Sequence, residues 1–154
     1  MNIKGIIIKI VLATADDYAA LTTLWEASVR ATHDFLTEEH ILMLRQQIQE
    51  VYMPQLPIWI ATNEAGIALG FIGCHQNRVE MLFVSPQNRG AGVGKFLLHY
   101  AITALAVNEV DVNEQNPQAA GFYLRMGFEP VGHSERDGEG NPFPLLHLRL
   151  RQRV

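Results

Sequence analysis

The chain has 154 residues, 48% of them apolar and 18% charged, with a formal net charge of −4 at pH 7. This composition excludes a disordered chain and is typical of one folded domain with its own core, so we expect a single domain over residues 1–154. The acidic balance argues against a nucleic-acid partner, which usually meets a concentrated basic surface. Cys74 is the single cysteine, which excludes an internal disulfide, and its apolar neighbours predict a buried strand residue.

No apolar stretch approaches the ~20 residues that a membrane helix needs. The apolar N-terminal run is short, is interrupted by Lys9, and lacks a small-residue cleavage site. We therefore expect a soluble, cytoplasmic protein that has no membrane partner and is either a monomer or a homodimer. The six histidines show no metal-ligand spacing, so we expect no metal site.

The N-terminal third predicts one strand and two helices. Residues Ile3–Leu12 are rich in β-branched side chains, which favours a strand. Thr14 is followed three residues later by an acid, a pattern typical of a helix start, and an apolar stripe at helical spacing runs to about Arg30. Thr37 can cap a second helix, which we expect Pro54 and Pro57 to end.

The rest of the chain alternates between strands and helices. A glycine-rich turn leads into a helix with one apolar face, and a second helix opens at Asn116 and ends at Gly127. The expected strands are Trp59–Thr62, Ile67–His75, Arg78–Val84, Val110–Val112, Glu129–Glu135 and Leu145–Leu150. The resulting order is βααβββαβαββ, which predicts an α/β fold: one mixed sheet with helices on both faces.

The stretch Val84–Lys95, VSPQNRGAGVGK, lies between an expected strand and an expected helix. Glycines allow a tight turn and let a ligand approach the backbone amides closely. A helix begins with unpaired N–H groups and a partial positive charge. Together these features predict an anion site suited to phosphate.

Two common phosphate loops do not fit this stretch. A P-loop requires glycine where Arg89 stands and a hydroxyl where Phe96 stands. The dinucleotide fingerprint fails as well, because Gly90, Gly92 and Gly94 are each two residues apart. A third pattern, Arg/Gln-x-x-Gly-x-Gly/Ala, is filled by Arg89, Gly92 and Gly94. For these six residues alone, a glycine-rich turn without a ligand stays an equal alternative.

The chain resembles the GNAT superfamily of acyl-CoA-dependent N-acyltransferases. In that family the third pattern holds the coenzyme A pyrophosphate and follows an apolar strand and a proline, as Leu82–Pro86 does here. A second family motif, an asparagine followed by a tyrosine-containing helix that ends in Gly-Phe, matches Asn116–Phe128. More narrowly, three segments resemble the small bacterial YjaB-type acetyltransferases: Ala31–Leu36, Val112–Asn116 and Pro142–Leu146.

The resemblance implies that acetyl-CoA is the co-substrate. Leu82, Phe83 and Val84 would lie along the pantetheine arm, with a backbone N–H aimed at the thioester oxygen. Asn116 would either bind that arm or serve only as a helix cap. The residues implied for the pyrophosphate are Arg89, Gly90, Ala91, Gly92, Val93, Gly94 and Lys95.

The resemblance also implies acetyl transfer to a primary amine of a small molecule or peptide, by direct attack. Tyr123 would protonate the departing thiolate and Glu80, directly or through water, would take the amine proton. Glu80 shares the strand parity of Leu82 and Val84, so we expect it on their side of the sheet. An exposed or salt-bridged Glu80 without a catalytic role is an equal alternative.

The acceptor is expected between two loops, residues 31–36 and 137–144. In the family this first loop borders the acceptor pocket, so the resemblance implies His33, Asp34 and Phe35 as acceptor-binding residues. His33 is also the second candidate for the base because histidine titrates in the useful range, although an ordinary loop residue without a catalytic role is the favoured alternative. Two other classes of protein remain open. One is a non-catalytic acyl-CoA-binding module, and the other is an interaction protein whose glycine loop is only a turn.

Overall fold

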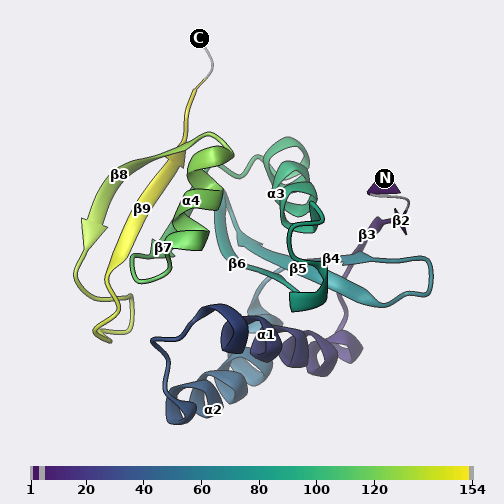
Figure 1. Cartoon of the computed structure of the whole chain (residues 1–154), viewed down its shortest axis with the longest axis horizontal. Helices are drawn as coiled ribbons and strands as arrows, with labels where there is room; N and C mark the ends of the chain where they lie inside the picture. The colour runs from purple at the N-terminus through teal and green to yellow at the C-terminus, as the bar shows by residue number, and fades with distance from the viewer. Residues whose placement is uncertain (1, 4–5, 153–154) are drawn as a thin grey trace.

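The protein is described by a computed structural model that covers residues 2–3 and 6–152. Within that part of the chain, seven strands form one sheet in the order β3-β4-β5-β6-β7-β9-β8 (Figure 1). Only β6 and β7 run parallel in this sheet, and every other neighbouring pair is antiparallel. The strands are β3 (Lys9–Leu12), β4 (Ile58–Thr62), β5 (Ala68–His75), β6 (Arg78–Val84), β7 (Glu109–Asn113), β8 (Phe128–Ser134) and β9 (Leu145–Leu150).

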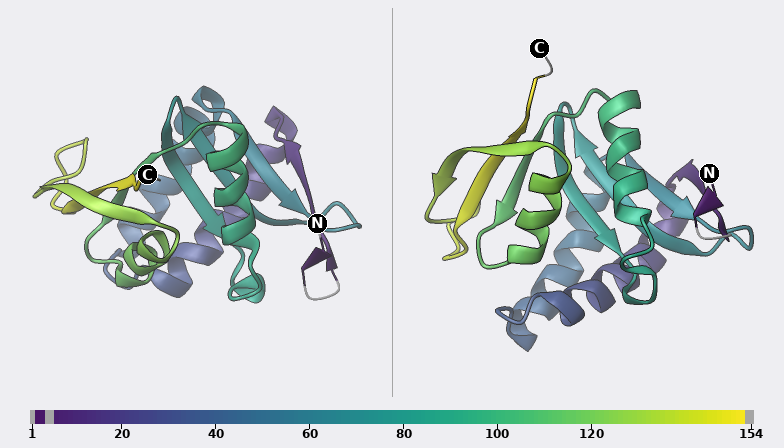
Figure 2. Two further views of the ribbon diagram at one scale, coloured as in Figure 1. Left: turned by 90° about the horizontal axis from the view of Figure 1, so that it is seen from above. Right: turned by 45° about the horizontal axis from the view of Figure 1, so that its top comes forward.

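Helices cover both faces of the sheet, as expected (Figures 1 and 2). Helices α1 (Tyr18–Thr32) and α2 (Glu38–Gln47) share a buried cluster with one face, in which Phe71 and Met53 are fully buried. Helices α3 (Val93–Ala104) and α4 (Pro117–Arg125) share a second cluster with the opposite face, in which Leu97 and Ile72 are fully buried. The predicted α/β fold and element order are confirmed for these elements.

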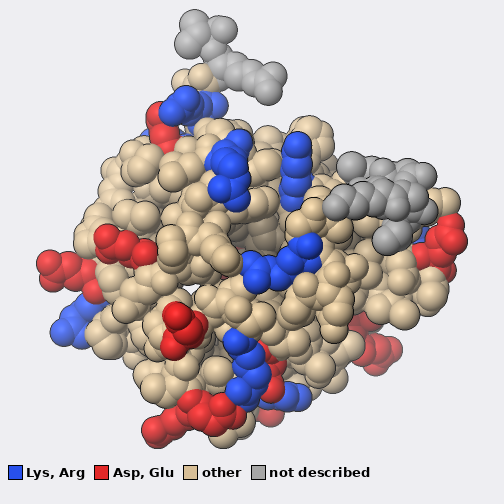
Figure 3. All heavy atoms as spheres, in the orientation of Figure 1, with Lys and Arg blue, Asp and Glu red and all other residues tan. Residues whose placement is uncertain are grey.

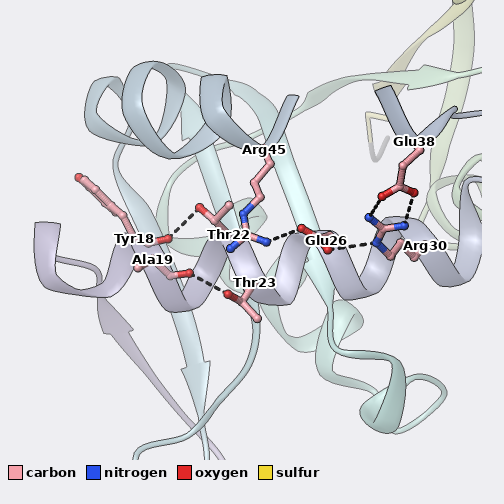
Figure 4. Close-up of polar contacts among 8 residues, drawn as sticks. All are labelled: Tyr18, Ala19, Thr22, Thr23, Glu26, Arg30, Glu38 and Arg45. Atoms are coloured by element: carbon pink, nitrogen blue, oxygen red, sulfur yellow. Dashed lines mark hydrogen bonds and ion pairs between the residues drawn. The ribbon is translucent and has the colours of Figure 1, made fainter. Parts of the chain in front are cut away.

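Two arginines tie α1 to α2 (Figure 4). The Arg30 guanidinium donates to both carboxylate oxygens of Glu38, over 2.7 and 2.6 Å, and to Glu26 over 3.1 Å. Arg45 on α2 also donates to Glu26. Beside these cations the pKa of Glu26 and that of Glu38 are lowered. Thr37 accepts from the His40 N–H over 3.2 Å, which confirms the predicted cap and fixes the α2 end of the short α1–α2 loop.

The second predicted helix is less regular than its pattern suggests. Helix α2 ends at Gln47, and a π-helical turn over Ile48–Tyr52 and a 3-10 turn over Met53–Gln55 follow it. A π-helical turn winds with i→i+5 hydrogen bonds, so it brings side chains five apart toward one face. Ile48 and Met53 are both buried here, so the wider turn serves the core.

The predicted strand Ile3–Leu12 is divided. Residues Lys9–Leu12 form edge strand β3, whereas β1 (Asn2–Ile3) and β2 (Ile6–Ile7) pair with each other in a separate ladder. Residues 4–5 of the predicted strand lie outside the described residues. Ile8, between the two ladders, is 1% exposed and anchors this end of the chain in the core. Across the described residues, no helix is long and apolar enough to cross a membrane.

Candidate active site

Strands β6 and β7 separate at Glu80. They pair only at Arg78 with Glu109 and at Val79 with Val110, and their ribbons diverge beyond that point (Figure 2, right). On its other side, β6 pairs with β5 through Met81 and Val79 and leaves Glu80 without a partner. Glu80 is therefore the extra residue of a β-bulge, a feature that re-aims a side chain and is common beside active sites.

The bulge overturns the expected alternation of β6. We expected Val79, Met81 and Phe83 on one face and Glu80, Leu82 and Val84 on the other. In the structure Val79 instead shares its buried cluster with Leu82 and Val84, whereas Met81 and Phe83 belong to the opposite cluster. The extra residue shifts the side-chain parity by one, and Glu80 consequently reaches cavities on both faces.

The α3–α4 cavity, of about 840 Å³, opens between the diverging strands, the N-terminal end of helix α3 and one face of helix α4 along its whole length. The chain turns into α3 through Gly90 and Gly92, whose φ values of +77° and +92° lie in the region that favours glycine. The first i→i−4 bond of α3 runs from the Phe96 N–H to the Gly92 carbonyl, so the Val93, Gly94 and Lys95 amides precede the helical ladder. All three residues line the cavity, which suits a phosphate ligand.

Cationic side chains surround the same cavity. Arg89, Lys95 and Arg125 line it, and Arg89 is held by Gln118 of α4, whose Oε1 accepts from the guanidinium over 2.7 Å. Basic side chains gather over the upper and central part of the molecular face that shows α3 and α4 (Figure 3). After Val79, no described strand pairs with the β7-facing edge of β6, so the backbone there can bind a ligand. These groups fit coenzyme A: amides and cations for the pyrophosphate, and a strand edge for the pantetheine arm.

Tyr123 lines the α3–α4 cavity from α4 and is 6% exposed. Its ring packs edge-on against Phe122 and Phe128, with centroids 5.1 and 5.6 Å away. Burial, with a smaller contribution from Cys74, raises the pKa of the Tyr123 phenol well above its ordinary value. Its hydroxyl makes no hydrogen bond within the described part of the chain, so a protonated donor faces the cavity.

The α1–α2 cavity, of about 640 Å³, lies on the other face of the sheet. Aromatic rings form much of its wall: His33 contacts Phe35 with centroids 5.3 Å apart, and Phe143 contacts Phe35 and His40 at 6.0 and 5.6 Å. The loop between β8 and β9 closes one side, where the Tyr52 hydroxyl donates to the Glu139 carboxylate. Asp137 and Glu139 add acidic groups to this rim.

The two cavities meet at five residues: His33, Glu80, Met81, Phe83 and Asn113. Glu80 is the carboxylate among them. Glu80 is exposed to solvent at this junction, and its partial burial raises its pKa; Arg78 and His75 oppose this shift, and Asp111 adds to it. A carboxylate with a raised pKa is a stronger base, and this one lies where a group in one cavity can reach a group in the other.

Most of the predicted site residues come together around these cavities. The α3–α4 cavity is lined by Leu82, Phe83, Val84, Arg89, Gly90, Gly92, Val93, Gly94, Lys95, Asn116 and Tyr123. Ala91 lines neither cavity and packs against the core, and Asp34 is exposed and also lines neither. Phe35 lines the α1–α2 cavity, and His33 lines both.

Asn116 is the N-cap of α4, as predicted. Its Oδ1 accepts from the Ala119 N–H over 3.2 Å, and Pro117 occupies the first helical position. Four further residues line the cavities and are not predicted from the sequence, because they come from helix faces and from the π-helical turn: Arg125, Gln118, Tyr52 and His40. A basic residue at the end of the tyrosine-containing helix was the available signal for Arg125.

Comparison with known proteins identifies the class of this fold and site. A family model described as "Acetyltransferase (GNAT) domain" matches residues 21–149, so the chain belongs to the GNAT acetyltransferase family. It is an N-acetyltransferase, and acetyl-CoA is the acetyl donor that this family uses.

Individual relatives are close in sequence and structure. Peptidyl-lysine N-acetyltransferase YjaB of Salmonella typhimurium is 40% identical over 128 residues, which are 83% of this chain and 88% of the relative. The solution structure of apo-form YjaB from Escherichia coli matches with a TM-score of 0.87 at 37% identity and covers 96% of this chain and 99% of that one. PaiA N-acetyltransferase from Thermoplasma acidophilum, in complex with coenzyme A, shares the fold with a TM-score of 0.73 at 20% identity, covering 95% and 99% of the two chains.

Proposed function

We propose that the protein transfers the acetyl group of acetyl-CoA to the side-chain amine of lysine in a peptide or protein. The observation that carries the proposal is the junction of the two cavities at Glu80. A thioester that enters from the α3–α4 side and an amine that enters from the α1–α2 side would meet there. The YjaB relatives are named peptidyl-lysine N-acetyltransferases, which supports lysine as the acceptor.

The coenzyme would bind by its anionic and pantetheine parts. The amides of Val93, Gly94 and Lys95, together with Arg89, would hold the pyrophosphate. The backbone of Leu82, Phe83 and Val84 would run beside the pantetheine arm, with one N–H directed at the thioester oxygen. A donor in that position stabilises the oxyanion of the tetrahedral intermediate, which is commonly the largest catalytic contribution.

Counted from the ammonium form, the reaction requires two protons to leave the lysine nitrogen, one proton to reach the sulfur, and the other to reach solvent. A lysine amine with a pKa of ~10.4 is mostly protonated at neutral pH, so Glu80 would remove its proton, directly or through water. The neutral amine nitrogen would then attack the thioester carbon, and the second proton would pass from the cationic nitrogen of the tetrahedral intermediate to solvent. The C–S bond breaks as the tetrahedral intermediate collapses, and Tyr123 would give its proton to the thiolate and later regain one from solvent.

Burial affects both the donor and the acceptor of the proton that Tyr123 would give to the coenzyme thiolate. Cys74 lies near enough to Tyr123 for its thiolate form to affect the phenol. Burial is the main cause that raises the pKa of the Cys74 thiol to about 11. Cys74 itself lines neither cavity, but a coenzyme thiolate beside Tyr123 in the α3–α4 cavity would also be partly removed from water and would be a stronger base than in water. Proton transfer from the Tyr123 phenol to that thiolate moves a charge between two buried groups, so it does not bury an additional charge.

The α1–α2 cavity suits a lysine side chain. Its aliphatic and aromatic wall, including Phe35 and Phe143, can contact the four methylene groups. Glu80, Asp137 and Glu139 can attract the ammonium group.

We also propose that the reaction takes place in the cytoplasm, where acetyl-CoA and protein lysines are both present.

An acceptor panel tests the proposal. Acetyl-CoA would be offered with a lysine peptide blocked at its N-terminus, a lysine-free peptide with a free N-terminus, a polyamine and an aminoglycoside. We expect CoA thiol release with the lysine peptide and acetyl-lysine in its mass spectrum. Faster reaction of another amine would assign a different acceptor. Binding of acetyl-CoA without thiol release in the presence of any of the amines would indicate a non-catalytic binding module.

A further inference from the structure

His33 and Asn116 join the two walls of the site. His33 is the first residue after α1, Asn116 is the cap of α4, and the two are 83 positions apart in the sequence. The His33 Nε2 lies 3.2 Å from the Asn116 Nδ2. His33 lines both cavities, and its ring also contacts Phe83, with centroids 6.5 Å apart.

The direction of every hydrogen bond in this link follows from its neighbours. The Thr32 hydroxyl donates its one proton to the Ser28 carbonyl over 2.8 Å, so toward the His33 Nδ1, 2.7 Å away, it can only accept. His33 therefore carries its proton on Nδ1, and its Nε2 lone pair faces Asn116. The Asn116 Oδ1 already accepts from the Ala119 N–H, which leaves the amide N–H to donate to His33.

This arrangement leaves His33 without a free lone pair for a substrate proton. A protonated ring would direct an Nε2–H at the Asn116 amide, where a donor would face a donor. Burial, followed by the nearby Arg89, lowers the pKa of His33, and Asp34 opposes that shift. The neutral, Nδ1-protonated ring is thus favoured both by its bonds and by its surroundings.

We infer that His33 is a positioning residue, which fixes the Asn116 cap, and with it the start of α4, relative to the α1–α2 cavity. Helix α4 carries Gln118, which holds Arg89, and Tyr123, about two turns after the cap. A shift of α4 would move the proposed acid and the proposed phosphate ligand together. This inference goes beyond the proposed function, and only its kinetic test rests on acetyl transfer.

Three variants separate positioning from proton transfer. His33→Gln has a side-chain carbonyl that can accept from Asn116 but cannot serve as a base between pH 6 and 9. We expect His33→Ala to lower kcat by about 10-fold to 10²-fold through misplacement of the reacting groups, and His33→Gln to recover most of it. Asn116→Ser keeps a good helix cap and removes the donor to His33, so its kcat should fall as in His33→Ala.

The double variant His33→Ala/Asn116→Ser should be no slower than the slower of its parents, because both changes break the same link. If the kcat losses of the two single variants instead multiply in the double variant, the proposed link between His33 and Asn116 is wrong. A His33→Gln variant that is folded and as slow as His33→Ala would overturn positioning and make His33 the base. Melting curves for each variant provide the folding control.

A spectroscopic readout does not depend on the acceptor or on turnover. The ¹⁵N shifts of the His33 ring should report the neutral Nδ1–H tautomer at pH 7, and Asn116→Ser should change those of Nε2 selectively. A neutral Nε2–H tautomer or an imidazolium at that pH would overturn the inference, even if lysine acetylation is found. Failure of all acceptors would instead refute the proposed function and leave this result standing.

Discussion

Arg89 and Gln118 hold the glycine-rich turn between β6 and α3 against helix α4, because the Arg89 guanidinium donates to Gln118 Oε1 over 2.7 Å. Arg89 is thereby oriented toward the α3–α4 cavity before a ligand binds. A hydrogen bond to a charged group contributes about 1.5–3 kcal/mol, so Arg89→Ala should weaken CoA binding by about 10-fold to 10²-fold. Gln118→Ala should have a smaller effect, since it leaves the charge in place.

Isothermal titration with CoA measures both variants. Their melting temperatures without ligand serve as the control, and we expect little change because Arg89 is exposed. Wild-type affinity in Arg89→Ala would exclude this arginine as a pyrophosphate ligand.

Gly92 tests the backbone part of the same site. CoA at 100 times its dissociation constant should stabilise the wild-type fold by about 2.7 kcal/mol, and Gly92→Ala should abolish that gain. Because Gly92 has a φ of +92°, the substitution also strains the backbone, by about 1–3 kcal/mol.

Gly66 provides the matched control for that strain. It has a φ of +80° in the turn between β4 and β5, and a Cβ there would meet nothing within 4 Å. Gly66→Ala should lower the melting temperature and keep the full CoA-induced rise. If Gly92→Ala also keeps the rise, the anion loop is assigned wrongly.

Tyr123→Phe separates binding from chemistry. The ring packing against Phe122 and Phe128 is kept, and no described partner loses a hydrogen bond, so stability and acetyl-CoA binding should change little. Turnover should fall by about 10²-fold or more, the lower end of what a positioned acid contributes. Since burial raises the phenol pKa, the wild-type rate should show no alkaline fall from Tyr123 up to pH 10. With chemistry rate-limiting, an unchanged kcat in Tyr123→Phe would assign the acid elsewhere.

Glu80→Gln should have a pH-dependent effect on rate. Below the pKa of the lysine acceptor, ~10.4, the reaction needs a base, so the deficit should be about 10²-fold or more near pH 7. It should shrink as the pH approaches 10, where solution supplies neutral amine. Parallel pH–rate profiles on one peptide provide the comparison. A constant ratio from pH 6 to 10 would argue for a purely structural Glu80.

The pH dependence of the melting temperature tests the protonation of Glu80 independently of turnover. Because its pKa is raised in the folded state, the folded protein holds the Glu80 proton more tightly than the unfolded chain does. That stabilisation is present in acid and is lost as the pH rises through the folded-state pKa. Because Glu80 is exposed, solvent screens this effect, so Glu80→Gln should melt at or slightly above the wild-type temperature at pH 7 and lose that difference below about pH 4. A lower melting temperature at pH 7 would indicate that the ionised carboxylate stabilises the fold.

The sequence predicts those parts of the site that depend on local backbone chemistry. The tight turn at Gly90 and Gly92, the Asn116 cap and the helix end at Gly127 are predicted from residue types that strongly favour these local conformations. The element order follows from periodicity in the same way. These predictions needed no knowledge of distant contacts.

Other features depend on contacts between distant segments, and the sequence does not reveal them. The bulge at Glu80 breaks a regular alternation that the residues of β6 by themselves favour. The π-helical turn that places Tyr52 beside Glu139 responds to the burial of Ile48 and Met53. The bond from Asn116 to His33 joins two helix ends and changes the interpretation of His33 from a possible base to a positioning residue.

The central claim is direct transfer from acetyl-CoA to a lysine amine, and single-turnover mass spectrometry of the intact protein tests it most directly. Excess enzyme would be mixed with acetyl-CoA, first without and then with an N-terminally blocked lysine peptide. We predict an unmodified chain in the first mixture, since the Cys74 thiol, with a pKa of about 11, is protonated at neutral pH, and one acetyl group on the peptide lysine in the second. An acetylated chain that passes its acetyl group to the peptide, or a peptide that stays unmodified, would contradict the claim.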